Sequence, residues 1–189
     1  MNSGRSRESK RLVVAMTGAS APQLGVSLLE AVANVANIET HLIVSASANR
    51  TIELETDFSV QEVEALADVV YNPTDYAAAV SSGSFMTMGM VIIPCSMSSL
   101  GAIANGISTS LVTRAADVTL KERRPLVLVA RETPLNLIHL RNMVAVTEAG
   151  ATVLPPTPAF YHQPTSIAEL VSQTVGKVLD QFGVENNLF

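Results

Sequence analysis

Small and hydroxyl-bearing residues stand where four apolar segments of this 189-residue chain end. The runs are "TGAS" at 17–20, "VSAS" at 44–47, "PCSMSS" at 94–99 and "ARET" at 130–133. Backbone N–H groups and hydroxyls at the start of a helix bind phosphate well, because the unsatisfied amides and the helix dipole both favour an anion. For the runs at 18–20 and 96–99, helix capping would use the same residue types without any ligand, and each of these two runs taken alone favours that simpler interpretation.

Charged residues beside these runs could add catalytic chemistry. Arg131 and Glu132 are adjacent, and Lys121 precedes them within "KERR". An arginine and a lysine can hold an anionic leaving group, and a neighbouring carboxyl can transfer a proton. On spacing alone, an ordinary ion pair and a solvated loop are the simpler interpretation. On the same simpler interpretation, Glu55 would be a residue on the surface of a helix, and Tyr161 would cover the edge of the core.

The elements that must position these residues alternate between two periodicities. Strands are expected at 12–16, 39–47, 88–96 and 125–132, with a short fifth strand within 151–160. Helices are expected at 23–36, from 48, at 59–68, after 96, at 134–149 and at 166–182. A loop is expected at 71–84. This alternation predicts a Rossmann-like (flavodoxin-like) three-layer α/β/α fold with a mostly parallel sheet. It forms one domain over 11–189, after a flexible tail at 1–10. Ligands of such folds bind beyond the carboxyl ends of the strands, so the four polar runs are expected on one edge of the sheet.

The composition of the chain argues against nucleic-acid-binding, metal-binding and membrane-spanning proteins. A net charge of −5 without a large basic block argues against nucleic acid, and three dispersed histidines argue against a metal site. No apolar run approaches the roughly 20 residues of a membrane span, so the 48% hydrophobic content indicates a homo-oligomer. Cys95 is the single cysteine, which is typical of a cytoplasmic protein.

The motif "TGASAPQLG" also limits the ligand. It lacks the G-x-G-x-x-G fingerprint and a Walker lysine, so a mononucleotide phosphate is favoured over NAD or ATP. Ser20 lacks the G-x-S-x-G context of a hydrolase nucleophile.

Longer motifs resemble one known family. The runs "TGAS", "HLIVSASA", "LETD", "SSGSF", "GMVIIPCSM", "RAADVTLKERRPLVLVARETPL", "HLRNM" and "PPTPAFYHQP" resemble, in order from 12 to 182, the UbiX family of flavin prenyltransferases. The resemblance implies transfer of a dimethylallyl group from dimethylallyl monophosphate to N5 and C6 of reduced FMN, without a metal. The product, prenylated FMN, would serve a UbiD-type decarboxylase in ubiquinone synthesis or aromatic-acid metabolism. A homododecamer with sites at subunit junctions is also implied.

The resemblance also assigns site residues. Positions that match FMN-binding residues of the family are Gly18, Ala19, Ser20, Ser45, Ser96, Met97, Ser98, Ser99, Arg114 and Arg131. Positions that match its prenyl-phosphate pocket are Lys121, Arg131, Glu132, Tyr161 and Lys177. Catalytic roles are implied for Glu132 and Ser20 in proton handling, for Lys121 at the leaving phosphate and for Glu55 in supporting the site.

Departures from the family pattern keep two alternatives open. Ala21 and Pro22 stand where the family usually has Gly-Ala, and a positive φ is expected at Ala21. Lys177 replaces the usual arginine, and "ENNLF" stands at the last positions before the family's usual Arg-Trp. One alternative is an FMN-binding carrier subunit of an aromatic-acid decarboxylase, such as the 3-polyprenyl-4-hydroxybenzoate type. The other is a peptidyl-cysteine decarboxylase, whose catalytic histidine and "PAMN"-like motif are not visible.

Overall fold

A computed structural model describes residues 9–33 and 35–189. The described residues form one sheet of six parallel strands in the order β3-β2-β1-β4-β5-β6. Its strands are β1 (Lys10–Met16), β2 (Ile38–Val44), β3 (Val69–Tyr71), β4 (Gly89–Cys95), β5 (Leu126–Ala130) and β6 (Thr152–Val153). The direction of chain progression reverses between β1 and β4, which is the Rossmann order. The predicted fold class is confirmed.

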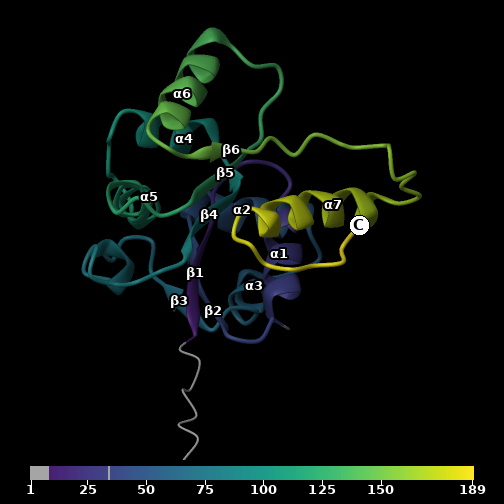
Figure 1. Cartoon of the computed structure of the whole chain (residues 1–189), viewed down its shortest axis with the longest axis horizontal. Coiled ribbons are helices and arrows are strands. Elements are labelled where there is room, and N and C mark those ends of the chain that lie inside the picture. Colours follow the sequence, from purple (N-terminus) through teal and green to yellow (C-terminus); the bar gives the residue numbers. More distant parts are fainter. Residues whose placement is uncertain (1–8, 34) are drawn as a thin grey trace, which may run out of the picture.

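Helices cover both faces of the sheet (Figure 1). They are α1 (Gln23–Ala33), α2 (Ala46–Glu55), α3 (Val60–Glu64), α4 (Met97–Ala104), α5 (Leu111–Lys121), α6 (Leu137–Glu148) and α7 (Ile167–Asp180), with a 3-10 turn, η1, at Ala79–Ser81. One apolar core packs α1, α2, α3 and α7 against the sheet. A second core packs α4, α5 and α6 against the other face.

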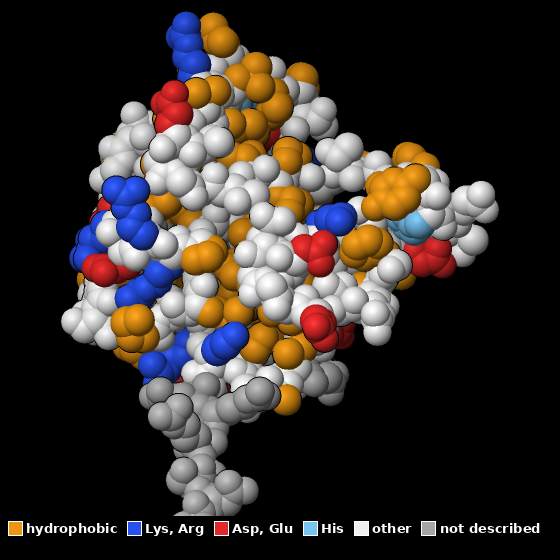
Figure 2. All heavy atoms as spheres, viewed as in Figure 1, with side chains coloured by type: hydrophobic (Ala, Val, Ile, Leu, Met, Phe, Trp, Pro, Cys, Tyr) orange, Lys and Arg blue, Asp and Glu red, His pale blue; other side chains and the backbone are white. Residues whose placement is uncertain are grey.

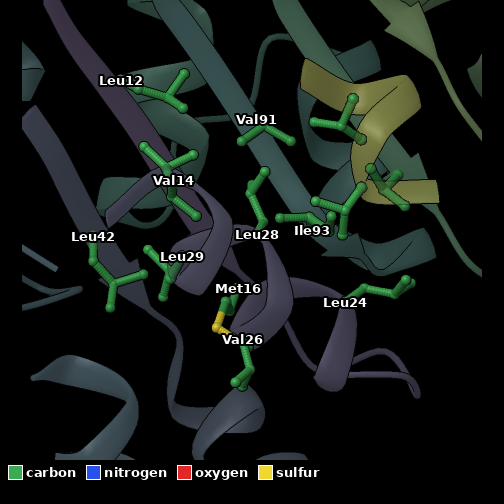
Figure 3. Packing of buried hydrophobic residues seen from close by; sticks show 14 of the residues in the cluster. Leu12, Val14, Met16, Leu24, Val26, Leu28, Leu29, Leu42, Val91 and Ile93 are labelled. Atoms are coloured by element: carbon green, nitrogen blue, oxygen red, sulfur yellow. The ribbon is translucent and has the colours of Figure 1, made fainter. Parts of the chain in front are cut away.

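The central strands are apolar along their length because helices bury them on both sides. Leu12, Val14 and Met16 of β1 point into the first core, where they meet side chains of α1 (Figure 3). Val13 and Ala15 of the same strand point into the second core. Because both faces of the strand are buried, its sequence is a continuous run of apolar residues instead of an alternation of apolar and polar ones.

Four expectations need correction or qualification. β3 lies where a helix end and a loop are expected; it is a three-residue edge strand, too short to show a period. The second strand ends at Val44, because Ser45 caps α2. The fourth strand ends at Ala130, so Arg131 and Glu132 stand on the following loop. The tail expected at 1–10 falls mostly outside the described residues, and Lys10 is the first residue of β1.

Candidate functional site

The ends of β2 and β4 both lead into helix N-termini at the carboxyl edge of the sheet. The Ser45 hydroxyl accepts a hydrogen bond from the Ala48 N–H (3.2 Å), and the Ser96 hydroxyl accepts one from the Ser99 N–H (3.3 Å). The capping interpretation is therefore confirmed for Ser96, and Ser45 is a cap as well, although the sequence pattern places it within a strand. The first N–H groups of a helix have no partner within that helix, so α2 and α4 still direct donors at this edge.

The loop after β1 lies directly against the start of α2. A Cβ atom on Gly18 would lie 2.5 Å from both Cβ and Oγ of Ser47. Such a contact is far inside van der Waals distance, so any larger residue would push these loops apart. The loops after β1 and β2 therefore form one continuous surface.

Glu55, the last residue of α2, joins this surface from the side. Its Oε2 accepts hydrogen bonds from the Ser20 hydroxyl (2.8 Å) and from the Ala21 N–H (2.9 Å). Ala21 has a φ of 75°, as its place in the motif predicts. The structure thus unites the two residues to which the resemblance gives proton-handling and supporting roles, Ser20 and Glu55.

Arg131 follows β5 at the same edge. Its N–H donates to the carbonyl of Cys95 (3.2 Å), so the chain stays beside the end of β4. The Arg131 side chain lines a shallow groove of about 210 Å³, together with Gln23 of α1, Pro156 and Thr174 of α7. Glu132 is exposed and accepts a hydrogen bond from the Thr133 N–H (3.0 Å). The Arg131 guanidinium is thus the cationic group of a groove whose other lining residues are mostly apolar.

One chain does not bring the remaining predicted residues to this edge. Lys121 ends α5 just before β5 begins, so it lies at the opposite edge of the sheet, paired with Glu122. Lys177 is in the last turn of α7, 3.3 Å from the Asp180 carboxylate and over the ring of Phe189. Both side chains lie toward the edge where the strands start.

Arg114 and Tyr161 also have other partners. Arg114 forms an ion pair with Asp117 (2.8 Å) and donates to the carbonyl of Ser81 (3.3 Å). Tyr161 is 71% exposed on the segment between β6 and α7, where its hydroxyl accepts a long hydrogen bond from Gln173 (3.4 Å). An exposed phenol on a projecting segment is available to a neighbouring molecule.

Burial makes the thiol beneath the site unreactive. Cys95 ends β4 with no exposed surface, and burial raises its pKa to about 12. Because the nucleophilic form is the thiolate, this side chain serves packing at ordinary pH.

Metal and membrane features are absent from the described part of the chain. Within residues 9–33 and 35–189, no three His, Cys, Asp or Glu side chains are grouped as metal ligands. None of the helices in the same residues combines the length and apolarity that a membrane crossing requires.

The sequence-based prediction of the site does not include Thr17. Its hydroxyl is buried between the ends of β1 and β4 and forms hydrogen bonds with the Pro94 carbonyl and the Ser96 N–H of the β4 segment. One feature of the sequence could have indicated this residue: a hydroxyl that directly follows five apolar residues at a strand end has to find buried partners.

Comparison with known proteins establishes the family. The model of the Flavoprotein family matches residues 1–179. Flavin prenyltransferase UbiX of Escherichia coli (strain K12) is 55% identical over 175 residues, which cover 93% of each chain. The chain belongs to the UbiX family of flavin prenyltransferases. The resemblance seen in the motifs is thereby confirmed.

Solved structures of UbiX proteins superpose on this chain closely. AnUbiX in complex with FMN and dimethylallyl pyrophosphate has a TM-score of 0.94 at 53% identity, with 96% of each chain covered. A dodecameric FMN-dependent UbiX-like decarboxylase from Escherichia coli O157:H7 has a TM-score of 0.92, also at 53% identity, and covers 93% of this chain and 96% of its own. The Rossmann architecture described above is therefore the UbiX architecture.

Proposed function

We propose that this chain is a flavin prenyltransferase, which transfers a dimethylallyl group from dimethylallyl monophosphate to N5 and C6 of reduced FMN. The observation that carries the proposal is the continuous surface of strand-end loops at the reversal of strand order, in a member of the UbiX family. AnUbiX is a relative whose structure contains FMN and a prenyl diphosphate. The product, prenylated FMN, would be consumed by a UbiD-type decarboxylase in the cytoplasm.

The residues at the carboxyl edge fit FMN as a substrate. The N–H groups of Gly18 and Ser20 and those at the starts of α2 and α4 would hold its phosphate, since helix N-termini bind anions. These segments also contain the matched residues Ala19, whose N–H donates to the Thr17 carbonyl (2.8 Å), and Met97 and Ser98, which lie in the first turn of α4. Arg131 would contact the flavin from the end of β5. Reduced FMN supplies the electron pair that forms the new bond to carbon.

The protein's main chemical task is to stabilise the leaving group. As the C–O bond of the donor breaks, its electron pair departs on the phosphate, so cations matter more than a nucleophilic side chain. Lys121, Arg131 and Lys177 would hold that phosphate, with Tyr161 donating a hydrogen bond. Glu132 and Ser20 would manage the proton, while Glu55 fixes Ser20 through its 2.8 Å hydrogen bond.

A complete site would need more than one subunit. Lys121 and Lys177 lie toward the edge opposite Ser20 within the chain, so they would reach a site only on a neighbouring copy. The dodecameric relative from Escherichia coli O157:H7 supports a homododecamer here. Arg114, beside Ser81, would approach the flavin at such a junction.

An FMN carrier without transferase activity is the second candidate. Lys177 favours it, because a lysine lacks the paired donors of arginine and this one is already beside Asp180 and Phe189. The carrier would bind FMN at the same loops and leave the flavin unchanged.

Anaerobic incubation with reduced FMN and dimethylallyl monophosphate separates the two candidates. Mass analysis of the flavin should show the addition of one five-carbon prenyl unit. The matched control is Glu132→Gln, which keeps the side chain's size while removing its charge and should abolish most of the transfer. Unmodified FMN bound to the wild-type protein would instead favour the carrier.

A further inference from the structure

The paired register of β1 and β4 ends near their carboxyl ends, where the order of the sheet reverses. Their parallel register runs from the Leu12–Gly89 pair to the Ala15–Ile92 pair and stops there. Pro94 follows on β4 and has no N–H to offer the ladder. Another group must therefore join the last residues of the two strands.

The side chain of Thr17 supplies that connection. Its hydroxyl donates a hydrogen bond to the carbonyl of Pro94 (2.9 Å) and accepts one from the N–H of Ser96 (2.8 Å). The Thr17 N–H reaches the same carbonyl at 3.2 Å. Thr17 is only 2% exposed, so water cannot replace these bonds easily.

These bonds connect the two candidate phosphate loops. Thr17 immediately precedes Gly18, whose loop lies against Ser47, and Ser96 is the N-cap of α4. The Ser96 hydroxyl in turn bonds to the N–H and hydroxyl of Ser99. The Thr17 hydroxyl, together with the Thr17 N–H, thus links the first loop to the residues at the start of α4.

We propose that Thr17 is a positioning residue for the FMN phosphate: it sets the spacing of the loops at 18–20 and 96–99 without contacting the ligand itself. The inference rests on the proposed function, because it assumes that these loops bind the phosphate of FMN. Its consequence is specific to that phosphate. Affinity for FMN should depend on the Thr17 hydroxyl, while affinity for riboflavin, which has no phosphate, should not.

The decisive variants are Thr17→Val, which keeps the shape and removes the hydroxyl, and Thr17→Ser, which restores it. Thr40→Val is a matched control. Thr40 is 3% exposed, and its hydroxyl likewise donates one hydrogen bond, to the Asp68 carboxylate (2.8 Å), and accepts one, from the Asp68 N–H (3.0 Å). These bonds join β2 to the segment before β3, away from the phosphate loops. Dissociation constants for FMN and riboflavin are measured by quenching of flavin fluorescence.

The expected result is a loss of about tenfold in FMN affinity for Thr17→Val, the usual effect of losing a net hydrogen bond or two. Riboflavin affinity should change less than about twofold, and Thr17→Ser should bind FMN as the wild type does. Thr40→Val should unfold at a lower temperature yet keep its FMN affinity. If Thr17→Val does not fold, Thr17→Cys provides a weaker hydrogen-bonding group of similar size, and its FMN loss should be smaller but equally selective.

Two outcomes overturn the inference while the proposed function stands. One is wild-type FMN affinity in Thr17→Val; the other is an equal loss for riboflavin, which would reveal general damage rather than phosphate positioning. Failure of the wild-type protein to bind FMN would be a different result, since it would remove the proposed function and this inference together.

Discussion

At the residue scale, the turn after β1 combines backbone strain with a fixed carboxylate. Ala21 adopts a φ of 75°, a conformation that costs a residue with a Cβ atom roughly 1–2 kcal/mol relative to its right-handed form. Its N–H donates to Glu55 at 2.9 Å, so the strained residue also holds the side chain that orients Ser20. The strained residue Ala21 is thus hydrogen-bonded to Glu55, the partner of Ser20 in the candidate catalytic pair.

Replacing Ala21 by glycine should relieve this strain. Ala21→Gly is expected to raise the free energy of unfolding by up to about 1 kcal/mol, because glycine adopts positive φ without a steric penalty. Ala31→Gly, in the interior of α1, is the control and should lower it by about 1 kcal/mol. Urea denaturation measures both. Equal destabilisation by the two glycines would show that Ala21 is not strained.

Lys177 is the second residue whose identity matters. Lys177→Arg should lower the KM for dimethylallyl monophosphate by a few fold with little change in kcat, because arginine binds phosphate through two parallel hydrogen bonds. Steady-state prenyl transfer at varied donor concentration tests this. Lys10→Arg, at the start of β1, is the matched control. A raised KM in Lys177→Arg would mean that the pocket is shaped for lysine.

At the scale of elements, β3 depends on side-chain bonds more than on its own length. Asp68 Oδ2 accepts from the N–H (2.7 Å) and hydroxyl (2.8 Å) of Thr40. The hydrogen bond from the Thr40 N–H, foremost, holds the pKa of Asp68 below its ordinary value of 3.8. The ionised carboxylate therefore fastens this three-residue edge strand to β2.

The stabilisation by Asp68 should depend on pH. Since its pKa is lower in the folded state, the contribution is present above about pH 4 and is lost as the pH falls through the folded-state pKa. Asp68→Asn should thus be less stable than the wild type at pH 7, and the gap should close in acid. Urea denaturation from pH 7 down to pH 3 measures it. A gap that stays constant with pH would show that the charge of Asp68 contributes nothing.

At the scale of the whole molecule, α6 exposes several large apolar side chains, of the kind that helices usually bury. Hydrophobic side chains gather over it (Figure 2). Leu137, Ile138 and Val144 are 59%, 66% and 57% exposed, whereas Val146 is buried. Phe160 and Ile167, which flank the segment before α7, are 70% and 76% exposed. Apolar surface of this extent indicates contact with further copies of the chain.

A charge on this surface should break the assembly and, with it, the activity. Ile138→Glu is expected to give smaller particles by light scattering and at least a tenfold loss of prenyl transfer, because Lys121 and Lys177 would no longer reach a neighbour's loops. Val70→Glu is the control: Val70 is also exposed, but it lies on β3 at the other end of the sheet from α6. Full activity in a monomeric Ile138→Glu protein would show that one chain suffices.

Mixed assemblies test the shared site directly. Subunits carrying Ser20→Ala and subunits carrying Lys121→Ala should each be inactive alone. After co-assembly in equal amounts, about a quarter of wild-type activity should return, since a random junction pairs two intact halves that often in a symmetric oligomer. Prenyl transfer by the refolded mixture is the measurement. No recovery would place both residues in a site built from a single chain.

Much of the site could be predicted from local patterns. The cap Ser96 follows from neighbouring residues and the positive φ of Ala21 follows from the family pattern, and the structure confirms both. The sequence pattern places the cap Ser45 inside a strand instead. β3 could not be predicted, because three residues carry no period and its support comes from Asp68 and Thr40. The partners of Thr17 could not be predicted either, since they are 77 and 79 positions away in the sequence.

The sequence by itself determined the alternation of buried strands and amphipathic helices, and therefore a parallel sheet with its loops on one edge. It could do so because apolar periodicity and capping act over a few residues. Only the tertiary structure decided the strand order, the closure of the loops by Gly18 and Thr17, and the separation of Lys121 from Ser20. Those features depend on how elements that are distant in the sequence pack together, and no local pattern encodes which strand ends and loops meet.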